Sequence, residues 1–203
     1  MGALFAWDHG DGRDAAGNVA APLAAPVTHA QPAGTIAANA DDSAGAAFYS
    51  VDVVMLNSIA DAGRHLTDRL EGIPAATYSP VLLGADSARW YRLLVGAWPK
   101  QREADSALIA LRGAGVLEMG FGTVRRTPFA VRIADGVSLR AAMARATELR
   151  AQGLPAYVLE RDEGHAGVYA GAFETPSQGM ALLDMFKHAG IDATVAYRIG
   201  RGI

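Results

Sequence analysis

The segment WYRLLVGAWPKQREADSALIALRGAG, residues 90–115, decides the fold of this chain. It begins with the apolar and aromatic pattern of a strand, turns at a Gly-Ala-Trp corner and continues with the period of a helix. The segment HAGVYAGAFETPSQGMALLDMFKHAG, residues 165–190, repeats this order with a Gly-Ala-Phe corner. From the corner onward the two segments align without a gap, so we predict that the chain contains two copies of one folding unit.

Each copy begins with the same strand and helix. Residues 48–54 (FYSVDVV) and 128–134 (PFAVRIA) alternate with the period of two that marks half-buried strands. Ser58 and Ser138 follow at positions suited to cap the N-termini of two helices. Both helices then end at a glycine that leaves the helical conformation, followed by a proline that prevents continuation. These motifs are GIPA at residues 72–75 and GLPA at residues 153–156.

The remaining strands complete the pattern of each copy. Second strands are expected at residues 77–83 and 156–160, and final strands near residues 116–121 and at residues 191–199. Each copy therefore reads β-α-β-β-α-β. The fold class that this order predicts is α+β, with two helices on one face of a four-stranded antiparallel sheet in each copy.

The sequence predicts three parts of the chain. Residues 1–47 are rich in Ala, Pro and Gly and have no period, so we expect a disordered linker. The two copies then form domains at residues 48–120 and 127–203, joined by a short connection that includes GFGT, residues 120–123. No stretch reaches the roughly 18–20 apolar residues of a membrane helix, so contact with a membrane is expected only through an anchor upstream of Met1.

The composition excludes several classes of function. The chain has 203 residues, a net charge of −3 and no block of Lys or Arg, so we expect no nucleic-acid partner. It has no cysteine, which excludes disulfides and thiolate metal sites. The histidines lack ligand spacing, and no phosphate-binding loop or catalytic triad motif is present. We expect no metal, no cofactor and no enzymatic activity, because the one cluster of carboxylates that favours catalysis, Glu160, Asp162 and Glu163, lies in an exposed loop.

Three stretches of the sequence resemble the SPOR (sporulation-related repeat) domain family. They are YRLLVGAW at residues 91–98, Glu103-Ala104, and QGLPAYV at residues 152–158. The resemblance covers residues 48–119 and, in a degenerate form, residues 127–203. It implies a ferredoxin-like fold, a place in the bacterial periplasm or cell envelope, and non-catalytic binding of peptidoglycan at the septum during cell division. The implied ligand is the glycan strand stripped of its peptides, and envelope or divisome proteins are further possible partners.

Departures from the family pattern separate the two copies. The first strand of the family usually contains a glutamine, and here Asp52 and Arg132 take that position. The first copy keeps the arginine of the family's third strand, at Arg92, whereas the second copy has Gly167 there. The resemblance therefore implies that the second copy keeps the scaffold and has lost a polar residue of the binding surface.

Strand alternation predicts which side chains lie on the sheet face opposite the helices. In the first copy these are Trp90, Arg92 and Asp52, and in the second they are Tyr169 and Arg132. An aromatic ring stacks on the apolar face of a sugar, while a guanidinium group donates to hydroxyls or to the carboxylate of a muramic acid. These five residues are the candidate glycan-binding residues. The alternative is that they lie in an interface between the two copies, since exposed aromatic residues mark contact surfaces of any kind.

Two other functions fit the same pattern. The first is a protein-interaction scaffold that has kept the fold without affinity for glycan, which the departures at Asp52, Arg132 and Gly167 favour. The second is an ACT-like regulatory module that senses a small molecule such as an amino acid, because tandem β-α-β-β-α-β units also build such modules. Asp135-Gly136 is compatible with the glycine-containing turn that follows their first strand.

Overall fold

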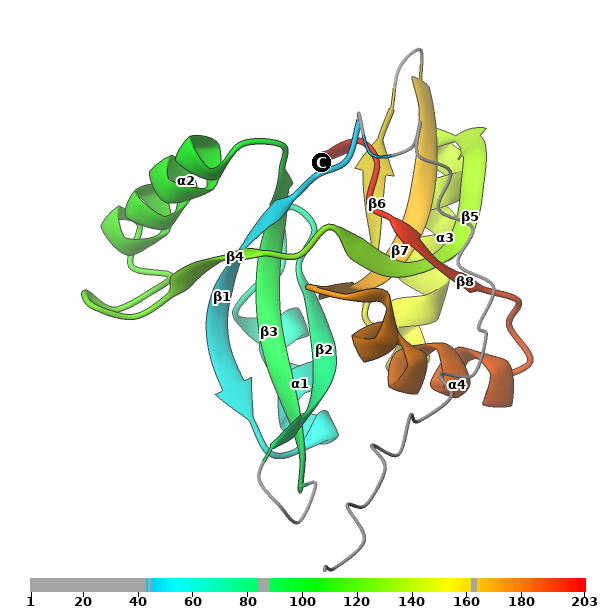
Figure 1. Cartoon of the computed structure of the whole chain (residues 1–203), viewed down its shortest axis with the longest axis horizontal. Helices are drawn as coiled ribbons and strands as arrows, with labels where there is room; N and C mark the ends of the chain where they lie inside the picture. Colours follow the sequence, from blue (N-terminus) through cyan, green and yellow to red (C-terminus); the bar gives the residue numbers. More distant parts are fainter. Residues whose placement is uncertain (1–42, 44, 84–87, 162–163) are drawn as a thin grey trace, which may run out of the picture. The chain divides into compact units, whose positions relative to one another are not determined.

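The computed structural model of this chain describes residues 43, 45–83, 88–161 and 164–203 (Figure 1). This part of the chain is a mixed α+β structure with two antiparallel sheets, of four and five strands, and four α-helices. Both copies lie within one compact unit.

The folded part begins before the boundary that the sequence indicates. Residues 1–42 and 44 of the expected linker lie outside the described residues. Ala46 and Ala47, which composition assigns to the linker, are buried. The backbone N–H of Ala47 donates to the carbonyl of Arg198 at 2.7 Å, so this end of the linker is tied to the second copy.

The first copy forms the four-stranded sheet, in the order β2-β3-β1-β4. Its elements along the chain are β1 (Tyr49–Leu56), α1 (Ile59–Asp68), β2 (Thr77–Leu83), β3 (Ala88–Trp98), α2 (Gln101–Gly113) and β4 (Thr123–Arg126). Ala62 of α1 and Leu108 of α2 share one apolar core with Val51 and Leu93 of the sheet. Both helices therefore cover the same face of this sheet.

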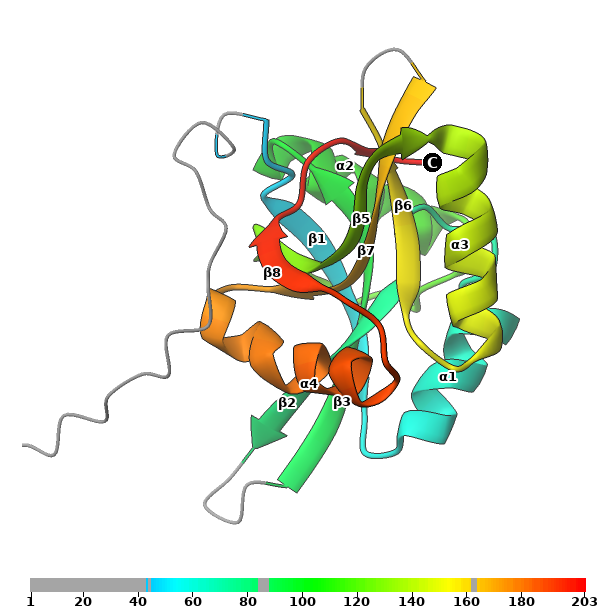
Figure 2. The same ribbon diagram turned by 90° about the vertical axis from the view of Figure 1, so that its right-hand side faces the viewer.

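The second copy forms the five-stranded sheet, in the order β8-β5-β7-β6-β9. Its elements are β5 (Phe129–Ser138), α3 (Leu139–Ala151), β6 (Ala156–Glu160), β7 (His165–Phe173), the 3-10 helix η3 (Pro176–Gly179), α4 (Met180–His188), β8 (Thr194–Tyr197) and β9 (Arg201–Gly202). Figure 2 shows α3 alongside β6. Leu149 of α3 and Phe186 of α4 pack in one core with Val131 and Val168.

The strand order is the same in the two copies apart from β9. In each, the fourth strand pairs with the first, the first with the third and the third with the second, always antiparallel. The expected β-α-β-β-α-β order is thus confirmed twice. The sequence pattern did not predict β9, a two-residue strand that pairs with β6.

The predicted helix starts are also confirmed. Ser58 caps α1 by accepting a hydrogen bond from the backbone N–H of Asp61. Ser138 caps α3 in the same way, with the N–H of Ala141 as donor. Each hydroxyl satisfies one of the N–H groups that have no partner within the first turn of a helix.

The repeated Gly-Ala-aromatic corner has a steric cause. Gly96 and Gly171 have φ values of 77° and 68°, in the left-handed region that residues with a Cβ atom rarely adopt. The aromatic ring two residues later folds back over each glycine, and a Cβ atom at Gly171 would lie 2.6 Å from the ring of Phe173. Phe173 is buried, and Trp98 is partly buried against the first core, so both corner aromatics contribute to the cores.

One expected strand position is wrong, and another expected strand is too long. The last strand of the first copy is β4, not residues 116–121, so the first copy extends beyond residue 120 and Thr123 of the GFGT motif belongs to its sheet. A strand of four residues is too short to show a period of two. Gly120 and Gly122, just before it, are typical of a linker. The last strand of the second copy is shorter than expected, because β8 covers only Thr194–Tyr197.

Candidate binding site

The sheet face of the second copy that points away from its helices is closed by the first copy. Tyr157, Leu159 and Tyr169 lie on this face and pack against alanines of the first copy and of the segment before it. These alanines are Ala47, Ala75 and Ala97. Tyr169 is 0% exposed. The prediction that Tyr169 binds glycan is therefore wrong, because its ring cannot reach a ligand, and the alternative interface between the copies is confirmed for this residue.

The absence of a side chain at Gly167 makes this closure possible. A Cβ atom on Gly167 would lie 2.6 Å from the ring of Tyr169. With no side chain at position 167, the Tyr169 ring lies flat near Tyr157, with their centroids 6.1 Å apart and the ring planes inclined by 26°. The buried position of the Tyr169 ring therefore depends on glycine at position 167.

Arg132, the other candidate of the second copy, is held near the surface by a carboxylate. Its Nη1 atom lies 3.1 Å from Oδ2 of Asp135, and Oδ1 of Asp135 lies 2.9 Å from Arg161. Arg161 donates in turn to the hydroxyl of Tyr169 at 3.2 Å. Arg132 and Tyr169 are therefore connected through ion pairs, but they do not form one exposed surface.

Hydroxyl groups on β2 join the first copy to the corner of β7. Thr77 Oγ1 donates to the carbonyl of Pro155 at 2.7 Å and accepts from the N–H of Gly171 at 2.8 Å. Ser79 Oγ donates to the carbonyl of Ala172 and accepts from its N–H, at 2.9 and 2.8 Å. The bonds to Gly171 and Ala172 satisfy backbone groups at the corner of β7, and the bond to Pro155 satisfies a carbonyl just before β6.

A buried arginine joins the copies on the other side. Arg198, just after β8, is 0% exposed. Its Nη atoms donate to the carbonyls of Gly96, Ala47 and Tyr49 and to the hydroxyl of Thr127, at distances of 3.1–3.3 Å. A charge so far from water is stabilised only by such a set of acceptors. Arg198 therefore fixes the position of the second copy against the first.

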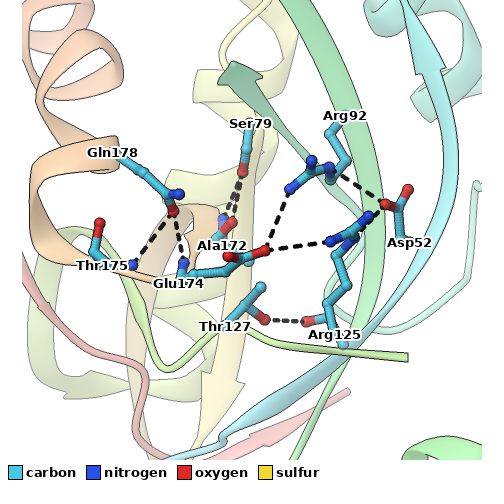
Figure 3. A network of polar contacts seen from close by, with 10 residues as sticks. Asp52, Ser79, Arg92, Arg125, Thr127, Ala172, Glu174, Thr175 and Gln178 are labelled. Carbon is cyan, nitrogen blue, oxygen red and sulfur yellow. Dashed lines mark hydrogen bonds and ion pairs between the residues drawn. The ribbon is translucent and has the colours of Figure 1, made fainter. Parts of the chain in front are cut away.

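The face of the first copy is covered in part and carries an ion network at its open end (Figure 3). Asp52 Oδ2 lies 2.6 Å from Nε of Arg125 and 3.3 Å from Nε of Arg92. Glu174, which follows β7 in the second copy, lies 3.7 Å from Arg92 and 3.4 Å from Arg125. The hydrogen bond that Arg125 donates to Asp52 and the charges of Asp52 and Glu174 raise the pKa of Arg125, although burial opposes this effect.

A pocket of about 460 Å³ lies beside this network. Its lining combines arginines, a carboxylate, an amide, a hydroxyl and aliphatic side chains. These are Arg89, Arg92, Arg125, Glu174, Gln178, Ser177, Pro80, Val81, Leu82, Leu83 and Ala181. Trp90 is half-buried on β3, the strand that also carries Arg92, but it is not among the described residues that line the pocket. Of the five candidates, the structure thus brings Arg92 and Asp52 together and leaves Trp90 to one side.

Two residues of the network escaped the sequence prediction. Arg125 lies in the part of the chain that we expect to be a linker, and only recognition of TVRR as a strand would have placed it beside Asp52. Glu174 comes from the second copy, and no sequence pattern connects it with Arg92. Asp162 and Glu163, of the acidic loop, lie outside the described residues.

A second cavity, of about 360 Å³, lies between α2 and the end of the first sheet. It is lined almost entirely by aliphatic side chains, small residues and the ring of Trp98. It offers no charged group to orient a polar ligand, so the pocket beside Arg92 is the better candidate for a binding site.

Comparisons with models of protein families, with curated proteins and with solved structures gave no match for this chain. The likeness to the SPOR family therefore remains a prediction from the motifs. No helix in the described ranges is both long enough and apolar enough to cross a membrane.

Proposed function

We propose that this protein is a non-catalytic, peptidoglycan-binding protein of the bacterial cell envelope that holds glycan strands through its first copy. The repeated strand order, β2-β3-β1-β4 and, apart from β9, β6-β7-β5-β8, supports the ferredoxin-like fold that the SPOR resemblance implies. The observation that carries the proposal is the pocket on the face of the first sheet. It is lined by Arg92, the residue that matches the arginine of the SPOR pattern.

The chemistry of the pocket suits a saccharide. Arg89, Arg92 and Arg125 supply donors in planar groups, which match hydroxyl pairs and carboxylates. Leu82 and Leu83 are exposed at its edge and offer an apolar surface for the face of a pyranose ring. The volume of about 460 Å³ is within the usual range of ligand pockets, about 300–1,000 Å³.

In this proposal the second copy supports the first. Its apolar face is buried and cannot bind a strand of sugars, but Glu174, Ser177 and Gln178 form one wall of the pocket. Two copies are thus needed for one site. This arrangement also buries apolar surface that a single unit of about 75 residues would leave exposed to water.

Sedimentation with isolated peptidoglycan sacculi tests the proposal. The protein should pellet with sacculi, and more strongly after amidase treatment has removed the peptides. Arg92→Gln should weaken binding about tenfold, which corresponds to about 1.4 kcal/mol. Asp52 keeps its closer partner Arg125, so this variant should stay folded. Arg145→Gln, which removes a charge from α3, is the matched control and should bind like the natural protein. Pelleting no greater than that of serum albumin would contradict the proposal.

A second candidate function is a protein-interaction scaffold, and one observation favours it. Three large apolar side chains are exposed on α2 and the loop before β4: Ile109 by 69%, Met119 by 81% and Phe121 by 61%. Large apolar side chains exposed to water mark contact surfaces. Cross-linking to an envelope protein that is lost in Met119→Ser/Phe121→Ser, while sacculus binding is absent from both proteins, would favour this function.

A further inference from the structure

The two carboxylates of the ion network hold the arginines unequally. Asp52 is well buried, with 13% of its side chain exposed, and lies 2.6 Å from Arg125. Glu174 has 42% of its side chain exposed and lies 3.4 and 3.7 Å from the two arginines. Asp52 is therefore a structural partner of the arginines, whereas the contacts of Glu174 are those of a weak, solvent-screened ion pair.

The backbone of Glu174 is fixed while its side chain is not. The N–H of Glu174 donates to Oε1 of Gln178 at 2.9 Å, which anchors the residue at the start of η3. Its carboxylate lies against Arg92 and Arg125. The carboxylate can thus leave the arginines by rotation of the side chain alone, without a change in the sheet or the helix.

The excess of arginines at the pocket favours an anion at this position. Arg89, Arg92 and Arg125 carry three positive charges at the pocket, and Asp52 alone would balance one of them. The buried Nε of Arg92 has no hydrogen-bond partner among the described residues, although Asp52 lies 3.3 Å away. Two guanidinium groups that face one point bind a carboxylate well, because each presents donors in a plane.

We infer that Glu174 occupies the position of a carboxylate of the bound saccharide, and that this carboxylate displaces Glu174 from Arg92 and Arg125. The inference rests on the proposed function. A muramic acid residue of a peptide-free glycan carries such a carboxylate on its lactyl group. In a glycan that still carries its peptides the same group is an amide without charge. A saccharide must compete with Glu174 for Arg92 and Arg125. A sugar with a carboxylate can replace the ion pairs of Glu174, whereas an uncharged sugar cannot and therefore binds more weakly.

Calorimetric titration with two saccharides tests this inference. The first is a tetrasaccharide of alternating N-acetylglucosamine and N-acetylmuramic acid with free lactyl groups, and the second is chitotetraose, which has no carboxylate. The natural protein should bind the first more tightly. Glu174→Gln should tighten binding of the muramic tetrasaccharide about three- to tenfold. Glu174→Ala, which removes the whole group, should act in the same direction.

The control is Glu148→Gln, which removes the same charge from the exposed face of α3 and should change neither affinity. An unchanged or weaker affinity of Glu174→Gln for the muramic tetrasaccharide would overturn the inference while sacculus binding still supported the proposed function. Equal affinity of the natural protein for the two saccharides would also overturn it. Absence of binding to both saccharides and to sacculi would refute the proposed function and the inference together.

Discussion

The two copies share a strand order and differ in the sheet face that points away from their helices. In the first copy Ser79 lies opposite Arg92, and in the second Leu159 lies opposite Gly167. The first face is polar and keeps a pocket at one end, whereas the second is apolar and closed. The difference shows that one copy of a repeated unit can use its sheet face to support the other copy. Gly167, which differs from Arg92 of the first copy, is one of the residues that allow this packing.

Gly167→Arg breaks the comparison most directly, because it gives the second copy the counterpart of Arg92 in the first. The new side chain would enter a buried face and displace the Tyr169 ring, which lies 2.6 Å from the Cβ position. Unfolding in urea should show a loss of about 3–5 kcal/mol. Gly113→Arg is the control, since nothing lies within 4 Å of a Cβ atom there. Equal stability of the two variants would mean that the second face is open.

Arg198→Leu tests whether the interface depends on its buried cation. The substitution leaves carbonyl groups of the first copy without their donor, and a buried acceptor without a partner costs about 1–3 kcal/mol. We expect a total loss of about 2–4 kcal/mol in the free energy of unfolding. Arg201→Leu, whose side chain is 82% exposed, should change stability by less than about 0.5 kcal/mol. A similar small effect of both changes would show that Arg198 does not hold the copies together.

Alkaline pH should lower the free energy of unfolding through Tyr157 on the closed face, by less than the two substitutions do. Burial raises the pKa of Tyr157 to about 12, although the nearby Arg198 opposes this shift. A tyrosine in the unfolded chain ionises near pH 10, so the unfolded state loses this proton first. The stability that the buried tyrosine contributes is thus complete below about pH 10 and is lost as the pH rises toward 12.

Urea midpoints measured between pH 9 and 11 check this expectation. Tyr157→Phe removes the titrating group and should make the decline in stability less steep. It should also cost about 1 kcal/mol at neutral pH, since the hydroxyl donates to the carbonyl of Gly171 at 3.0 Å. If the stabilities of the natural protein and the variant decline in parallel, folding does not raise the pKa of Tyr157, which would contradict this expectation.

The sequence was sufficient for the elements of each copy because their signals are local. Strand and helix periods, the capping serines and the Gly-Ala-aromatic corners lie within a few residues of one another. Strand β4 was missed because TVRR is too short to show a period and follows Gly120 and Gly122. The side of the sheet that Tyr169 faces was also predictable from alternation.

The candidate site was less predictable because it depends on how the copies meet. Alternation shows that Tyr169 and Arg92 point away from the helices, but not what covers them. Cover for Tyr169 comes from alanines distant in sequence, and Glu174 reaches Arg92 from the other copy. No local pattern contains these contacts. They arise from hydroxyl bonds such as that of Thr77 with the corner of β7 and from the buried Arg198.

The closed second face is the central claim, and hydroxyl-radical footprinting of the native protein with mass spectrometry tests it most directly. The method reports how readily each aromatic or sulfur-containing side chain reacts with a radical from water. Tyr157 and Tyr169 should react at the background level, while Met119 and Phe121, which are exposed, should react readily. Modification of Tyr169 at a rate like that of Phe121 would contradict the account, because a ligand could then reach both faces.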